Sequence, residues 1–103
     1  MDDKPNFDET NHERTSRQNE MLAAGDVIQA WRFRKIKEKR TREIRGEYRW
    51  IDGDVLAVVE TPCKGVDWVA MIQWREGNEV IEWDAIPSHS WRATSCYRRK
   101  PPT

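Results

Sequence analysis

Apolar and polar residues alternate along much of the chain from residue 26 onward, and this period of two is typical of β-strands. The apolar residues of DVIQAWRFRK and the isoleucine after it divide between two faces of an extended chain: Val27, Trp31 and Phe33 on one, and Ile28, Ala30 and Ile36 on the other. We expect a strand over this stretch. The stretch KEKRTRE that follows holds no apolar residue, which predicts a long solvated loop or the tip of a protruding hairpin.

Two further hairpins are expected downstream. Asp52-Gly53 separates two apolar runs, and this dipeptide is favoured in tight reversals, so we predict a turn there. After a loop at TPCKG, alternate residues of VDWVAMIQW are apolar and a turn is predicted at Glu76-Gly77-Asn78. Pro87 ends the returning strand because it has no amide hydrogen to donate. WRATSCYRR adds a last short edge strand.

Five or six short strands at this spacing predict a mainly β fold, either a small barrel or a sandwich. The length of 103 residues suits one domain with one small core. We expect a flexible acidic tail over residues 1–20, a single β-barrel domain over 21–100 and a polar end over 101–103. One short helical turn is expected between Ser16 and Ala24, ended by Gly25.

The order of short motifs over residues 27–91 resembles the Src homology 3 family of small β-barrels. Four stretches carry this resemblance, in the family's order: Ala30-Trp31-Arg32-Phe33, Gly53-Asp54-Val55-Leu56, Asp67-Trp68-Val69-Ala70 and Ile86-Pro87-Ser88-His89. The resemblance implies a five- to six-stranded Src homology 3-like barrel. It also implies a partner-binding groove formed by Trp68, Pro87 and Trp91.

Two departures separate the chain from the peptide-binding members of that family. Their long loop is acidic, whereas the corresponding stretch here is the basic RKIKEKRTREIR. Ser90 stands where those members have a groove tyrosine, although Trp91 beside it offers an aromatic surface. The resemblance therefore supports a barrel with a groove and argues against recognition of proline-rich peptides.

Charge is unevenly distributed although the formal net charge is zero. Residues 30–49 hold nine basic and three acidic side chains, and residues 50–91 hold two basic and eight acidic ones. Six of the cations crowd together with Glu38 as the single intervening acid: Arg34, Lys35, Lys37, Lys39, Arg40 and Arg42. This density favours an acidic ligand, which could be a phosphate backbone, an acidic protein surface or the chain's own acidic tail. The alternative interpretation is a solvated strand face and loop.

The six tryptophans cannot all fit inside so small a barrel. Core packing is the better interpretation for any one of them, but at least one exposed aromatic anchor is expected from the set. Glu82 and Asp84 lie two apart on a predicted strand and could form a catalytic acid–base pair. Their alternation with apolar residues is instead typical of a strand's solvent face.

Recognisable enzyme and metal motifs are missing from the sequence. Cys63 and Cys96 are 33 positions apart and belong to no Cys-x-x-Cys pair, so free thiols are expected. Neither a signal peptide nor a long apolar span is present, so we expect a cytoplasmic protein with no membrane contact. No cofactor and no small-molecule substrate are expected.

These observations together predict a non-enzymatic binding module of the adaptor or inhibitor type, a description that includes inhibitors encoded by phages or mobile elements. The expected partner is a larger protein or nucleoprotein with an acidic surface. Cations between Arg34 and Arg42 would steer it, and aromatic side chains would anchor it. The alternative is direct nucleic-acid binding with tryptophans as stacking platforms. The excess of acids in residues 50–91 weighs against that alternative.

Overall fold

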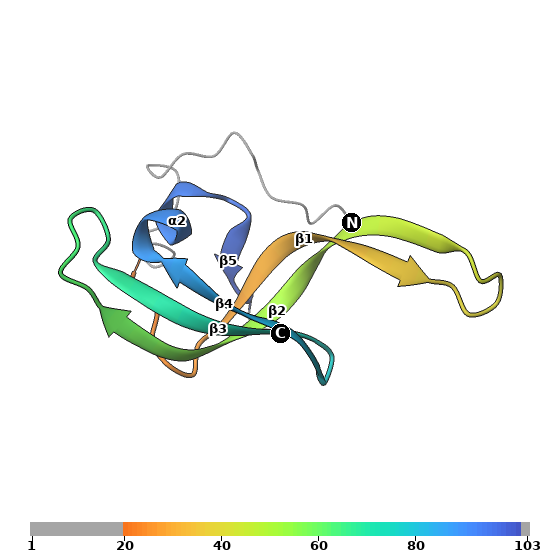
Figure 1. Cartoon of the computed structure of the whole chain (residues 1–103), viewed down its shortest axis with the longest axis horizontal. Helices are drawn as coiled ribbons and strands as arrows, with labels where there is room; N and C mark the ends of the chain where they lie inside the picture. The colour runs from red at the N-terminus through yellow and green to blue at the C-terminus, as the bar shows by residue number, and fades with distance from the viewer. Residues whose placement is uncertain (1–19, 102–103) are drawn as a thin grey trace.

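The structure, a computed structural model, describes residues 20–101 and is mainly β. One antiparallel sheet has the strand order β4-β3-β2-β1-β5. Its elements are β1 (Val27–Lys37), β2 (Ile44–Glu60), β3 (Trp68–Glu76), β4 (Glu79–Pro87), the short helix α2 (Ser88–Ala93) and β5 (Tyr97–Arg99). Figure 1 shows the β1–β2 hairpin extending well beyond the other elements. The expected acidic tail lies outside the described residues, apart from Glu20.

The sheet is open, so the expectation of a closed barrel is wrong. β4 and β5 are its two edges, and within residues 20–101 they do not pair with each other. Helix α2 connects them and places Trp91 in the core, where the side chain is fully buried. α2 follows β4 and packs against β3 and β4, so a helix covers the core where a barrel would close strand on strand.

The predicted turn at Asp52-Gly53 is also wrong, because both residues lie inside the 17-residue strand β2. They are hydrogen-bonded into the sheet on both sides: Gly53 pairs with Ile28 of β1 and with Trp74 of β3. Glycine is needed here for space. A Cβ at position 53 would lie 2.5 Å from carbons of the buried Trp74 ring.

The core forms on one face of the sheet, as the alternation predicts. Its buried members come from every strand except β5, and from the N-terminal segment and α2: Leu22, Ile28, Ala30, Ile51, Val55, Trp68, Ala70, Ile72, Trp74, Ile86 and Trp91. Tyr97 of β5 packs against it and stacks between Trp74 and Trp91, at centroid distances of 6.4 and 6.3 Å. The strands predicted before the KEKRTRE tip and on both sides of Gly77-Asn78 are confirmed.

The chain before β1 is held at a bulge in β2. Gly25 donates its amide to the Val55 carbonyl and the Asp26 carbonyl accepts the Val55 amide, both at 2.9 Å, beside the register shift between Val55 and Ala57. The expected helical turn falls partly on residues 16–19, outside the described part, and residues 20–24 form no helix. Leu22 is nevertheless buried, so this segment closes one end of the core.

The two glycines of β2 should respond differently to substitution. Gly53→Ala should lower the free energy of unfolding by about 1–3 kcal/mol, because the buried Trp74 ring cannot move away from the new methyl group. Gly46→Ala should stay within about 1 kcal/mol of the wild type, because the ring that it meets is the exposed Phe33, whose displacement breaks no contact in the buried core. Urea denaturation of both variants measures this difference. Equal losses would show that crowding against Trp74 is not the reason for glycine at position 53.

Candidate binding surface on the β1–β2 hairpin

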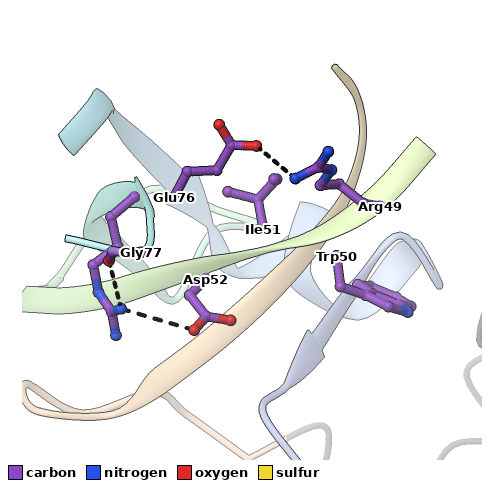
Figure 2. Close-up of a pocket in the computed structure, with 7 residues that line it drawn as sticks. Arg49, Trp50, Ile51, Asp52, Glu76 and Gly77 are labelled. Atoms are coloured by element: carbon purple, nitrogen blue, oxygen red, sulfur yellow. Dashed lines mark hydrogen bonds and ion pairs between the residues drawn. The ribbon is translucent and has the colours of Figure 1, made fainter. Parts of the chain in front are cut away.

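The β1–β2 hairpin has one face built from arginines that brace it against the β3–β4 hairpin. Arg32 forms ion pairs with Glu82 and with Asp84, the latter at 3.3 Å. Arg34 reaches Glu76 at 3.0 Å, and Arg49 reaches the same carboxylate at 3.3 Å, as Figure 2 shows for Arg49. These arginines and acids share the core side of the sheet, beyond the edge of the apolar core. Arg34 was expected to contact a partner, but here it holds two hairpins together.

The opposite face of the same hairpin is aromatic. Trp31 lies opposite Trp50 and Phe33 lies opposite Tyr48 in the strand register. Their ring centroids are 5.2 Å apart in the first pair and 5.4 Å in the second, and Trp31 lies 6.2 Å from Tyr48. We call these four residues the aromatic ladder. Tyr48 is 60% and Phe33 51% exposed, so the outer half of the ladder presents its rings to solvent.

The charges on the aromatic face are all positive. The register continues beyond the ladder with Lys35 opposite Gly46 and Lys37 opposite Ile44. No acidic residue occupies this face between Trp31 and Lys37 on β1 or between Ile44 and Trp50 on β2. At the other end, the Arg98 guanidinium lies 3.9 Å from the centroid of the Trp50 ring, a cation–π contact. The ladder thus lies between cations.

The hairpin tip carries the remaining predicted cations. Its turn is closed by the Glu38 amide, which donates to the Glu43 carbonyl at 2.8 Å, and Arg42 adopts a positive φ of 60°. The tip has a shallow depression of about 360 Å³. The side chains of five predicted site residues form no ion pair within residues 20–101: Lys35, Lys37, Lys39, Arg40 and Arg42. The prediction of a solvent-exposed hairpin tip is confirmed.

The three groove residues expected from the family resemblance are not gathered on an exposed surface. Trp68 and Trp91 are core residues with 1% and 0% exposure, so the expectation that they offer rings to a partner is wrong. Trp68 belongs to β3 and Trp91 to α2, and both side chains lie in the core because α2 packs against β3. Pro87 is half-buried at the end of β4. The exposed rings belong instead to the aromatic ladder and to Trp83.

Trp83 belongs to a second exposed apolar surface that the sequence did not single out. It is 68% exposed, and its indole NH donates to the Gln73 side chain at 3.2 Å. On the same outer side of the sheet, Met71 lies between Ala57 of β2 and Ala85 of β4. The sequence does contain a pattern for this surface: apolar residues of β3 and β4, such as Met71 and Trp83, also occur at the alternate positions that face away from the core.

A polar network separates the two exposed surfaces. Asp52 accepts hydrogen bonds from Lys100 at 2.7 Å and from Gln29 at 2.9 Å, and Arg75 binds Asp54 at 2.7 Å. Burial would raise the pKa of Asp52, but the hydrogen bonds from Lys100 and Gln29 and the charges of Lys100 and Arg75 outweigh it. They hold this pKa below its ordinary value of 3.8.

Figure 2 shows the shallow depression of about 190 Å³ beside this network. In Figure 2, Arg49 points to Glu76. Arg75 forms an ion pair with Asp52 and donates a hydrogen bond to the Gly77 carbonyl. Trp50 projects to the side of β2 opposite Ile51. Each charged side chain that lines this depression already has a partner within the chain, so the depression offers no unpaired charge to a ligand.

The comparisons add no assignment: no protein-family model, curated protein or solved structure matches the chain. Within residues 20–101, no helix has the length and apolarity needed to cross a membrane. In the same range, no three His, Cys, Asp or Glu side chains are placed to hold a metal ion. Cys63 and Cys96 are free thiols, as expected.

The Asp52 network should make stability depend on pH. Because the pKa of Asp52 is lower in the folded state, its contribution is present above the ordinary value near 4 and is lost as pH falls through the lower folded value. Asp52→Asn should therefore be destabilising at pH 6, and the difference from wild type should be smaller at a pH below the ordinary value near 4. Urea denaturation at both pH values measures it, with Glu79→Gln as a control because Glu79 is exposed and forms no ion pair with residues 20–101. A difference for Asp52→Asn that does not change with pH would contradict the network's role.

Proposed function

We propose that the protein is a non-enzymatic binding module whose β1–β2 hairpin engages an acidic macromolecular partner. One observation carries this proposal: five cations without an ion-pair partner within residues 20–101 gather on the hairpin, beside exposed rings. Uncompensated charge of one sign steers an oppositely charged partner and raises the association rate. Exposed aromatic side chains supply the contact energy once the partner is close.

The acids of the sheet do not oppose such a partner as strongly as their number suggests. Glu76, Glu82 and Asp84 are each paired with an arginine of the hairpin base. Asp52 and Asp54 are paired with Lys100 and Arg75. Pairing cancels most of the field of these acids at a distance, so the positive tip remains the dominant local charge.

The position of the hairpin favours a large partner. Residues 31–37 of β1 and 44–50 of β2 pair in the sheet only with each other, because β5 stops at its pairing with Ala30 and β3 begins its pairing at Asp52. The outer part of this arm extends beyond the body of the domain (Figure 1), while arginines brace the core face near its base against β3 and β4. An adaptor or inhibitor that inserts a hairpin into a larger protein or nucleoprotein would have this form.

We also propose that the domain is an open variant of the Src homology 3-like architecture. The order of elements supports this: an Ala-Trp strand, a long basic hairpin, a Gly-Asp strand, a Trp strand, and an Ile-Pro-Ser segment before a last short strand. The acidic loop and exposed groove rings of peptide-binding members have no counterpart among residues 20–101. Recognition of a proline-rich peptide is not part of the proposal.

Neutralising the hairpin tip tests the proposal. A variant with glutamine at Lys37, Lys39, Arg40 and Arg42 should bind both polyglutamate and mixed-sequence DNA more weakly. On DNA, a plot of the logarithm of the binding constant against the logarithm of the salt concentration has a negative slope. For the variant this slope should become less steep by up to about 0.7–0.9 for each phosphate that is no longer neutralised. Lys64→Gln is the matched control, since Lys64 is an exposed cation in the loop between β2 and β3. Fluorescence anisotropy over a salt series measures both ligands. The proposal fails if neither polyanion binds the wild type or if the control weakens binding as much.

A further inference from the structure

The aromatic face of the β1–β2 hairpin combines features that charge alone does not explain. From these features we propose that this face binds single-stranded nucleic acid, with bases stacked on Tyr48 and Phe33 and phosphates held by Lys35 and Lys37. The inference rests on the proposed function, because it names the kind of acidic partner that the hairpin engages. It places the ligand on the outer face of the hairpin and not only at its tip.

The rings are available for stacking. Tyr48 and Phe33 are more than half exposed, yet they are held in place by each other and by Trp31. The Phe33 ring packs over Gly46 on the neighbouring strand, where the absence of a side chain leaves room for it. A ring that is exposed and already positioned loses little conformational freedom when a base stacks on it. Every base has a π-face, so such stacking tolerates any sequence.

The cations lie on the same face as the rings. Side chains two apart on a strand point the same way and are about 7 Å apart, so Lys35 and Lys37 continue the line begun by Trp31 and Phe33. The face from Trp31 to Lys37 is about 20 Å long, which suits a few nucleotides of an extended strand. A single strand offers bases and phosphates side by side, and this face offers rings and ammonium groups side by side.

The acids that would repel a phosphate backbone lie elsewhere. Glu76 and Glu82 are on the opposite side of the sheet and are paired with arginines. Asp52 is on the outer side, next to Trp50, but Lys100 and Arg75 flank it. The excess of acids in residues 50–91, which weighed against a nucleic acid in the sequence, is thus removed from this surface by the fold.

A single strand fits the face better than the other acidic ligands. In a duplex the π-faces of the bases are hidden by their neighbours in the stack, so a duplex would use the lysines and leave the rings without a role. An acidic protein segment would likewise satisfy the lysines without any need for planar rings. Four adjacent aromatic residues on one face, with no acid between Trp31 and Lys37 or between Ile44 and Trp50, are what favour the single strand.

The test measures the affinity of the full chain for four fluorescein-labelled probes: oligothymidine, oligouridine, a duplex of the same length, and polyglutamate. The single strands are about 12 nucleotides long, which is within the site sizes of single-strand binders. The oligothymidine and oligouridine arms distinguish DNA from RNA. We expect a single strand to bind more tightly than the duplex and polyglutamate. Tyr48→Val and Phe33→Val should each weaken single-strand binding by roughly five- to a hundredfold. They should leave polyglutamate binding within about twofold, since they remove a ring but no charge.

Trp83→Leu is the matched control, because Trp83 is a similarly exposed ring on the other apolar surface and should leave all four affinities unchanged. Thermal melts check that Tyr48→Val and Phe33→Val remain folded. If one of the two variants unfolds, the other alone is enough for the test. Equal binding of all polyanions, unchanged by these two substitutions, would overturn the inference and leave the proposed function standing. Tighter binding of polyglutamate than of either single strand would overturn it in favour of an acidic protein. Binding of no probe would overturn both.

Discussion

The packing of the Trp74 ring directly on the backbone of Gly53 is the contact on which the sheet depends. Trp74 is fully buried at the centre of the core and stacks on Tyr97, which in turn stacks on Trp91 of α2. The close approach is possible only because β2 has no side chain at position 53. It lets one long strand pass across the middle of the domain, pairing with β1 along one half and with β3 along the other.

This contact also links the core to the charged braces. The Arg32 guanidinium lies 4.8 Å from the centroid of the Trp74 ring, and the same group pairs with Glu82 and Asp84. Each half-exposed ion pair contributes little alone, but arginines can hold a planar, fixed geometry. Three of them set the hairpin against β3 and β4. The lysines, whose flexible ammonium groups suit a mobile polyanion, lie on the other face and at the tip.

The sequence predicted those elements whose pattern is contained in a few neighbouring residues. The alternation in β1 and β3, the polar hairpin tip and the turn at Gly77-Asn78 are all visible in a few neighbouring residues. The alternation in β4 misled, because Trp83 faces solvent while Glu82 and Asp84 lie on the core side and pair with Arg32. Asp52-Gly53 misled because the same dipeptide serves a turn or a close approach, and what decides between them is Trp74, 21 positions further along the chain. The burial of Trp68 and Trp91 and the pairing of Arg34 likewise depend on contacts between distant strands, which no local pattern contains.

The aromatic ladder was missed for the same reason. The strand that carries Tyr48 and Trp50 was expected, but its register with Trp31 and Phe33 depends on pairing across the hairpin, which no local pattern contains. Once the strand is continuous, the two faces of one hairpin separate two tasks: the core side carries stability, and the outer side carries exposed rings. Such a face invites aggregation unless charge protects it, and like-charged lysines do so by repelling a second copy. Under the proposed function the same positive charge attracts a polyanion, so the feature that opposes self-association also favours a ligand that can cover the rings.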